Sequence, residues 1–209
     1  MTETHRSYNR QAQNYERRWK SYLSHTHHEF LQRIAVYEGD RLLDTSCGTG
    51  LLAGELIENQ LPFGSLHLND ISENMIAIAK DRLPDQANIH YSQLPADQLE
   101  QLNDTFEQIF CLNAFHHYEN QIKVVKNFYQ LLRKGGKAVI LDWNRVGLFR
   151  PINRIINKVV PEIIDTRSDR EMTNLLSDAG FRISKTESWA YRYWRFYFIE
   201  GVKADEASG

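Results

Sequence analysis

Glycines and an acidic residue lie at a spacing that suits binding of a nucleoside-like ligand. Residues 44–50 are Asp-Thr-Ser-Cys-Gly-Thr-Gly, in which Gly48 and Gly50 can take backbone torsions that other residues avoid and let a ligand approach the main chain. Asp70 follows Gly50 by 20 residues. A carboxylate at the end of the following strand can accept hydrogen bonds from both hydroxyls of a ribose. The simpler alternatives are a plain strand-to-helix turn for the glycines and a helix cap for Asp70.

Histidines supply the candidate acid–base chemistry. His116 and His117 come just after the apolar run 106–112, and an imidazole can take up or release a proton near neutral pH. We therefore consider both as catalytic candidates; the alternative is that one packs structurally and the other is solvated. His25, His27 and His28 look like a metal cluster by composition only, so we predict a surface location for them and no metal site.

Alternating strands and helices must position these residues. Short apolar runs predict strands at 41–43, 65–69, 88–92, 106–112 and 137–142, and helical spacing predicts helices at 51–61, 72–82 and 122–132. Ser72 is the expected N-cap of the second of these helices. Helices are also predicted at 8–19 and 28–36. This alternation favours a parallel sheet with helices on both faces.

The end of the chain has a different pattern. A helix through 172–179 should stop at Gly180, and the stretches 181–191 and 193–202 then follow with no helix between them. Two such strands should pair antiparallel. We therefore predict an α/β, Rossmann-like fold with a seven-stranded, mostly parallel sheet, helices on both faces and a C-terminal antiparallel hairpin.

Length and composition narrow the class of protein. The 209 residues are 42% apolar and 25% charged, with a net charge of −2, so nothing favours a nucleic-acid partner. No apolar run is long enough to span a bilayer, the first residues do not resemble a signal peptide, and Cys47 and Cys111 are expected to be reduced. A cytoplasmic location is the expectation. We predict one domain over 1–203, with a helical N-terminal extension (1–39), an insertion (144–168) and a flexible tail (204–209).

Taken in order, these segments resemble the class I S-adenosylmethionine-dependent methyltransferases, in particular the small-molecule branch that includes the quinone-biosynthesis enzymes. The resemblance runs over roughly residues 8–202. It is carried by residues 42–50 (the first motif), 70–75 (Asp-Ile-Ser-Glu-Asn-Met), 131–137 (the turn into the fifth strand), 175–181 (a helix ending in Ala-Gly-Phe) and 8–16 (an N-terminal helix that often closes over the cofactor).

The resemblance implies methyl transfer from S-adenosylmethionine to a small-molecule acceptor and does not distinguish O-, N- or C-methylation. It also assigns roles to individual residues. The methionine portion of the cofactor would lie on Asp44 and the main chain of Ser46, Cys47 and Gly48, with Gly50 completing the loop. Asp70 would hold the ribose, and the adenine would be surrounded by Ile71, Met75, Pro95 and Ala96. Leu112 would lie under the sulfonium, and Tyr8 and Tyr15 would line the acceptor side or cap the cofactor.

Two positions depart from the family pattern. Ser46 stands where the loop usually has glycine, and Pro95 stands where an acidic or amide residue usually meets the adenine amino group. Either Asp97 or the main chain would then contact the base. Residues 48–53 also fit the G-x-G-x-x-A pattern of NAD-binding proteins, but Asp44, the helical extension and the terminal hairpin argue against NAD. A non-catalytic, cofactor-binding relative is the other alternative.

The segment 148–160 lies where acceptors bind in the resembled family. It is amphipathic, with leucine, isoleucine and valine on one face and Arg150, Arg154 and Lys158 on the other. Such a helix could cover an apolar ligand, touch a membrane surface peripherally or pack against the sheet edge. The sequence does not choose among these, and it leaves the oligomeric state open.

Overall fold

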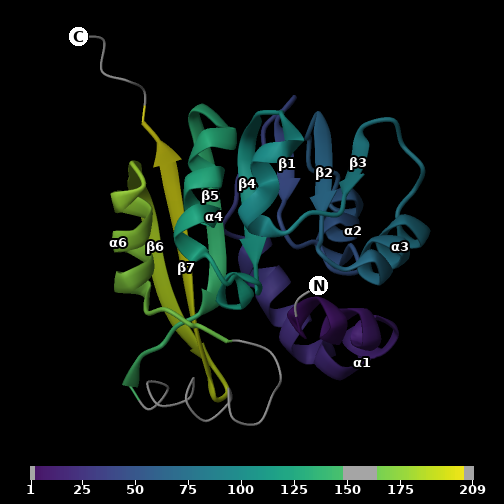
Figure 1. Cartoon of the computed structure of the whole chain (residues 1–209), viewed down its shortest axis with the longest axis horizontal. Coiled ribbons are helices and arrows are strands. Elements are labelled where there is room, and N and C mark those ends of the chain that lie inside the picture. Colours follow the sequence, from purple (N-terminus) through teal and green to yellow (C-terminus); the bar gives the residue numbers. More distant parts are fainter. Residues whose placement is uncertain (1–2, 148–163, 205–209) are drawn as a thin grey trace.

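Seven strands form a single sheet in the computed structural model, which describes residues 3–147 and 164–204 (Figure 1). The strand order is β3-β2-β1-β4-β5-β7-β6. Neighbouring strands are parallel from β3 to β5, whereas β7 runs antiparallel to both β5 and β6. This confirms the predicted fold class. The strands are β1 (Arg41–Asp44), β2 (Ser65–Asn69), β3 (Ile89–Ser92), β4 (Phe106–Leu112), β5 (Leu132–Trp143), β6 (Phe181–Tyr191) and β7 (Trp194–Lys203).

Helices cover both faces of the sheet because successive strand residues point in opposite directions. Leu42 belongs to one buried cluster, with Phe30 of α1 and Leu56 of α2, whereas the next residue, Leu43, belongs to a second cluster, with Phe128 of α4. Parallel strands buried on both faces are expected to be largely apolar, as β4 is apart from Glu107 and Gln108 near its start. The helices are α1 (Glu3–Leu31), α2 (Leu51–Glu58), α3 (Glu73–Arg82), α4 (Gln121–Leu131) and α6 (Asp169–Asp178), with short 3₁₀ turns η1 (Ala96–Leu102) and η2 (Phe115–His117).

Several predicted elements differ from the structure; the helix predicted at 51–61, for example, ends at Glu58. The separate helices expected at 8–19 and 28–36 are one helix, α1, which ends at Leu31. The fifth strand begins at Leu132 instead of residue 137, because Gly135 takes a φ of +73° and the chain continues in the sheet past the two glycines. The amphipathic segment 148–160 lies outside the described residues.

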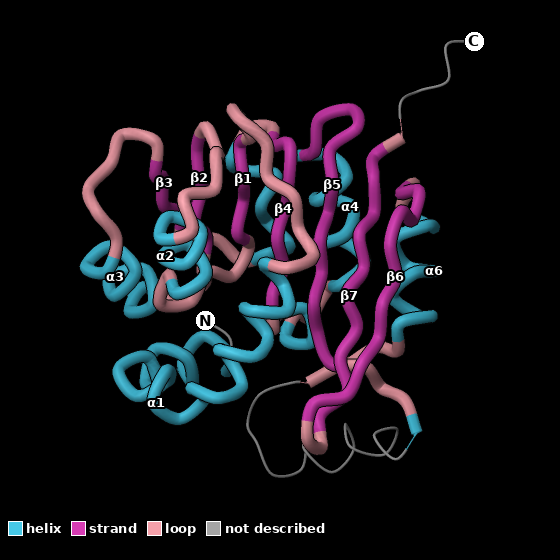
Figure 2. The backbone as a smooth tube through the Cα atoms, turned by 180° about the vertical axis from the view of Figure 1, so that it is seen from behind, coloured by secondary structure: helices cyan, strands magenta, loops and turns pink. Residues whose placement is uncertain are grey.

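The N-terminal helix packs against the C-terminal hairpin, and it crosses the end of the sheet toward which the strand arrows of β1 to β3 point (Figures 1 and 2). The His25 ring stacks on Tyr191 with 3.7 Å between ring centroids and accepts a hydrogen bond from the Trp189 indole at 3.1 Å. Just past the helix, Arg33 Nε lies 2.8 Å from Glu187 Oε2. His25, for which the sequence predicted a surface location, is therefore only partly exposed, because the hairpin packs on it.

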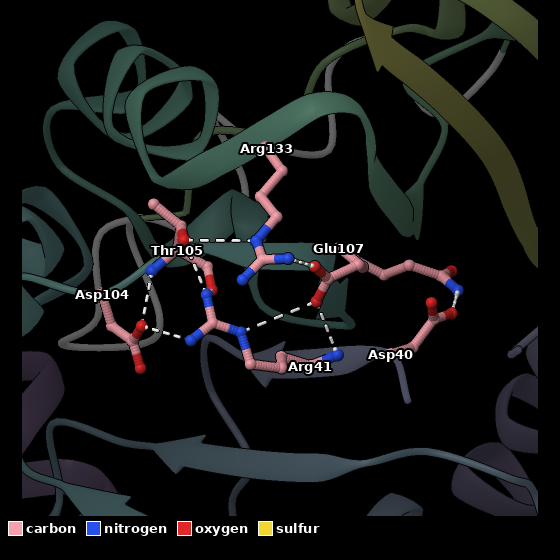
Figure 3. A network of polar contacts seen from close by, with 7 residues as sticks. Asp40, Arg41, Asp104, Thr105, Glu107 and Arg133 are labelled. Atoms are coloured by element: carbon pink, nitrogen blue, oxygen red, sulfur yellow. Dashed lines mark hydrogen bonds and ion pairs between the residues drawn. The ribbon is translucent and has the colours of Figure 1, made fainter. Parts of the chain in front are cut away.

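The opposite end of the sheet is joined by an ion-pair network (Figure 3). Arg41, which opens β1, donates its backbone N–H to Glu107 Oε2 at 2.7 Å and contacts Asp104 Oδ1 through Nη1 at 2.8 Å. Arg133 Nη1 lies 2.7 Å from Glu107 Oε1. One half-buried carboxylate of β4 thus connects the starts of β1 and β5.

We expect Glu107→Gln to lower the free energy of unfolding by about 1–2 kcal/mol, because both arginines lose the charge of Glu107 while the side-chain shape is kept; Arg41 retains its ion pair with Asp104. Urea unfolding measures this. Glu58→Gln is the matched control, since Glu58 is an exposed glutamate at the end of α2. Equal stability of the two variants would contradict a stabilising role for the network.

Candidate active site

Two adjoining cavities lie at the carboxyl ends of the central strands. The larger has a volume of about 280 Å³ and lies between the loop after β1, the loop after β3 and the segment after β4. The smaller, about 50 Å³, extends the site toward α1 and the start of α2. The two share lining residues of the glycine loop and of the end of β4, namely Ser46, Gly48, Leu112 and Asn113.

Most of the residues named from the sequence line one of these cavities. In the larger are Asp70, Ile71, Met75, Pro95, Ala96 and His117; in the smaller are Asp44 and Cys47; and Ser46, Gly48 and Leu112 line both. Gly50 and His116 line neither. Tyr8 and Tyr15 lie within α1, but their side chains are outside the described part of the structure.

The two glycines of the loop after β1 have different structural roles. Gly48 has a φ of +53°, and a Cβ added there would meet nothing within 4 Å, so the main chain is open at this point. Gly50 (φ +75°) is the N-cap of α2, and a Cβ there would lie 3.0 Å from the Ala79 Cβ. Gly50 therefore allows α3 to approach the loop closely, while Gly48 presents open backbone to the cavity.

Asp70 connects the loop to the end of β2. Its Oδ2 accepts the Gly48 N–H at 2.9 Å and its Oδ1 accepts the Ser72 N–H at 2.8 Å. Ser72 itself caps α3, since its Oγ accepts the Met75 N–H at 3.2 Å. Burial raises the pKa of Asp70 to about 6, against the lowering effect of these N–H donors. Ser72 is thus the side-chain cap of the helix, and the Asp70 carboxylate lines the larger cavity.

Asp44 is a second buried acid beside the first. Its pKa is raised to about 7, mainly by burial; the Ser46 N–H acts in the opposite direction, and the charge of Asp70 adds to the rise. Asp97 and Glu119 add to the carboxylates, and no lysine or arginine is among the described residues that line either cavity. Such a site suits a ligand with positive charge and hydroxyl donors, and it opposes a pyrophosphate.

The two adjacent histidines have different surroundings. His116 is 3% exposed; its Nδ1 lies 2.6 Å from Asp142 Oδ1 and its ring stacks on Trp143 at 4.1 Å between centroids. His116 thus ties η2 to the end of β5, outside the cavity. His117 lines the cavity, and burial lowers its pKa well below the usual range, so its imidazole is neutral there.

Several cavity residues were not identified from the sequence. The Tyr118 hydroxyl reaches back to the glycine loop, 2.8 Å from Ser46 Oγ and 3.1 Å from Thr45 Oγ1. His27 of α1 is 6% exposed and lies 3.2 Å from Glu55, so its predicted surface location is wrong. Both contacts join segments that are distant in sequence, so only the folded structure reveals them. The other cavity residues that the sequence did not identify include Leu94, Gln98, Asn113, Ala114, Asn120, Val124, Leu23, Thr49, Leu51 and Leu52.

Among these cavity residues, Asn113 is the one whose type and position could have marked it in the sequence. It follows β4 directly with a φ of +57°, a torsion that asparagine tolerates better than most residues. Its Oδ1 accepts the Tyr22 hydroxyl at 2.8 Å and its Nδ2 donates to Thr26 Oγ1 at 2.7 Å. Asn113 therefore links α1 to the point where the two cavities meet.

The strand order, the glycine loop after β1 and the buried acid after β2 agree with the class I methyltransferases that the sequence resembles. The family model described as a methyltransferase domain matches residues 8–186, and the chain belongs to this family. Within the described residues, no group of three or more histidines, cysteines or acids could hold a metal ion. No helix in the same part of the chain is long and apolar enough to cross a membrane.

Known proteins resemble the chain in sequence and in structure. It is 28% identical over 153 residues to the ubiquinone/menaquinone biosynthesis C-methyltransferase UbiE of Stenotrophomonas maltophilia (strain K279a). The aligned region covers 70% of this chain and 58% of that protein. The chain spans about half the length of the curated relatives it matches.

Solved structures share the fold. A chain of the complex between the Haloferax volcanii Trm112 methyltransferase activator and a methyltransferase superposes with a TM-score of 0.81 at 16% identity, covering 95% of this chain and 98% of that one. Magnesium protoporphyrin IX methyltransferase (ChlM) from Synechocystis PCC 6803, solved with bound SAH, gives a TM-score of 0.63 at 20% identity, covering 80% and 75%.

Proposed function

We propose that the chain transfers the methyl group of S-adenosylmethionine to a small-molecule acceptor. The observation that carries this is the pair of buried carboxylates, Asp44 and Asp70, in a cavity system whose described lining has no lysine or arginine to neutralise them. S-adenosylmethionine supplies the missing charges, since it bears an ammonium and a sulfonium group, and its ribose supplies two hydroxyl donors. The phosphates of NAD would meet the same carboxylates unfavourably.

The residues fit this cofactor portion by portion. Asp70 would accept the ribose hydroxyls, and Asp44 with the main chain of Ser46–Gly48 would hold the methionine portion. The side chains of Ile71 and Met75 offer apolar contact to the adenine, and Leu112 lines both cavities where the two portions meet. Pro95 and Asp97 lie at the adenine end, where either the backbone or the Asp97 carboxylate could contact the base.

The bound cofactor would supply an already activated methyl group, so the chain has to orient the acceptor and exclude water. His117 lines the larger cavity and would take the proton if the acceptor must lose one, although burial, by lowering its pKa, makes the neutral imidazole a weaker base. His116 would act only through its contact with His117, at 4.0 Å between ring centroids. Whether oxygen, nitrogen or carbon is methylated depends on the acceptor.

We expect calorimetry to show binding of S-adenosylmethionine or S-adenosylhomocysteine and none of NAD. Measurable NAD affinity with no response to either sulfur compound would overturn the cofactor assignment. A screen with labelled S-adenosylmethionine against quinone-like, aromatic and amine acceptors then tests turnover. Cofactor binding without transfer to any acceptor would favour a non-catalytic relative. The quinone-like class is included because the Stenotrophomonas relative is named for ubiquinone and menaquinone biosynthesis.

The remaining expectations belong to the same proposal. One domain over 1–203 is supported by the single sheet that the described strands form. A cytoplasmic location is supported by the two free, buried cysteines, Cys47 and Cys111, which fit a reducing compartment. The proposed partner is the small-molecule acceptor and not a nucleic acid, in keeping with a net charge of −2.

A further inference from the structure

Asn69 is the last residue of β2, is 1% exposed and does not line either cavity. Its side-chain amide nevertheless makes every hydrogen bond of which it is capable. Nδ2 donates to the carbonyls of Thr45 and Leu94, both at 3.0 Å, while Oδ1 accepts the Ser92 hydroxyl at 2.8 Å and the Leu94 N–H at 3.0 Å. An amide side chain has two donor hydrogens and two acceptor lone pairs, and here all four are satisfied.

Two of the partners of Asn69, Thr45 and Leu94, belong to different loops that line the same cavity. Thr45 lies in the loop after β1, and Leu94 lies in the loop after β3, immediately before Pro95; both residues line the larger cavity. The backbone carbonyl of Asn69 also accepts the Cys47 N–H at 2.8 Å. One buried residue therefore fixes the distance between the methionine side and the adenine side of the site.

We propose that Asn69 is a positioning residue, which sets the spacing of these two loops so that one cofactor molecule can contact both. The inference rests on the proposed function. The chemistry requires an amide at this place: an aspartate would set an acceptor against two carbonyl oxygens, and an apolar side chain would leave those carbonyls buried without donors. The next residue, Asp70, depends on the same geometry, because it holds the Gly48 N–H.

The test compares Asn69→Asp with wild type in calorimetry with S-adenosylhomocysteine, at a temperature where both are folded. At about pH 8 the introduced carboxylate repels the Thr45 and Leu94 carbonyls, and we expect affinity to fall by about tenfold or more. At about pH 5.5 the introduced carboxyl gains a proton and can again donate to one carbonyl. The ratio of the variant and wild-type dissociation constants should therefore shrink as the pH falls.

Asn144→Asp is the matched control, since Asn144 is 2% exposed and uses its amide for Ser188 and Asp169, away from the cofactor cavity. It should lose stability without losing cofactor affinity. Asn69→Ala, which adds no charge, should weaken binding by a factor that does not change with pH. Wild-type affinity in folded Asn69→Asp and Asn69→Ala would overturn the positioning role. Failure of the wild-type chain to bind S-adenosylhomocysteine would instead overturn the proposed function.

Discussion

Asp70→Ala is expected to weaken S-adenosylhomocysteine binding by several-fold to a few hundredfold in a protein that still folds. The variant loses the acceptor for the ribose hydroxyls and also releases the Gly48 N–H, which Asp70 Oδ2 holds at 2.9 Å. Losing a charge-assisted hydrogen bond costs about 1.5–3 kcal/mol, and each ~1.4 kcal/mol is a tenfold change in affinity. Calorimetry at neutral to slightly basic pH measures the change, and circular dichroism reports the folded state.

The matched control is Asp81→Ala, which removes the same charge from an exposed position of α3. Its affinity should equal that of wild type. Asp70→Asn, which keeps one acceptor oxygen and the shape of the side chain, should fall between wild type and Asp70→Ala. If a folded Asp70→Ala protein binds as tightly as Asp81→Ala, Asp70 serves the loop alone and not the ligand.

Cofactor affinity is expected to fall steeply in mild acid. The pKa of Asp70 is raised to about 6 and that of Asp44 to about 7, so both carboxyls are largely protonated at about pH 5 in the free protein. A ligand with cationic groups and hydroxyl donors prefers the ionised forms. Below its pKa, each carboxyl that must ionise costs about tenfold in affinity per pH unit. We therefore expect at least a tenfold loss between about pH 7.5 and pH 5.

The raised pKa values of Asp70 and Asp44 also determine how the stability of the free protein changes with pH. Both carboxyls bind protons more tightly in the folded than in the unfolded chain, so their contribution to stability is present below about pH 4 and is lost as the pH rises through 6 and 7. The increase in Tm on adding S-adenosylhomocysteine should accordingly be larger at about pH 7.5 than at pH 5. In Asp44→Asn the affinity should depend less steeply on pH. A flat affinity profile in the wild type would contradict ligand contact with these carboxylates.

Local patterns in the sequence predicted most of the elements. The strand limits of β2, β4 and β6 agree with the predicted ones, and Ser72 caps α3 as its position before a helical pattern indicates. Gly180, with a φ of +101°, ends the helix that precedes β6. Ile122 shares the helical spacing of Val125 and Phe128, which are buried, but is itself 56% exposed at the start of α4.

The site was predicted only where a backbone requirement or a local motif marks a residue. Gly48 and Asp70 are marked in this way, and both line the cavity. Asn69 and Tyr118 are not, because their roles depend on loops that are distant in sequence and adjacent only after folding. His116 and His117 are neighbours of the same type, and only the position of Asp142 at the end of β5 separates the structural one from the one that faces the cavity.

The packing of the first helix on the last two strands also governs how the chain can fold during its synthesis. Tyr22 packs on Phe196, and Arg33 pairs with Glu187, which lies 154 residues further along the chain. At roughly 5–20 residues per second, a ribosome needs about 8–30 s to make that stretch. β7, which is made last, is an interior strand between β5 and β6. The sheet can be completed, and α1 can gain its hairpin contacts, only after β7 has been translated.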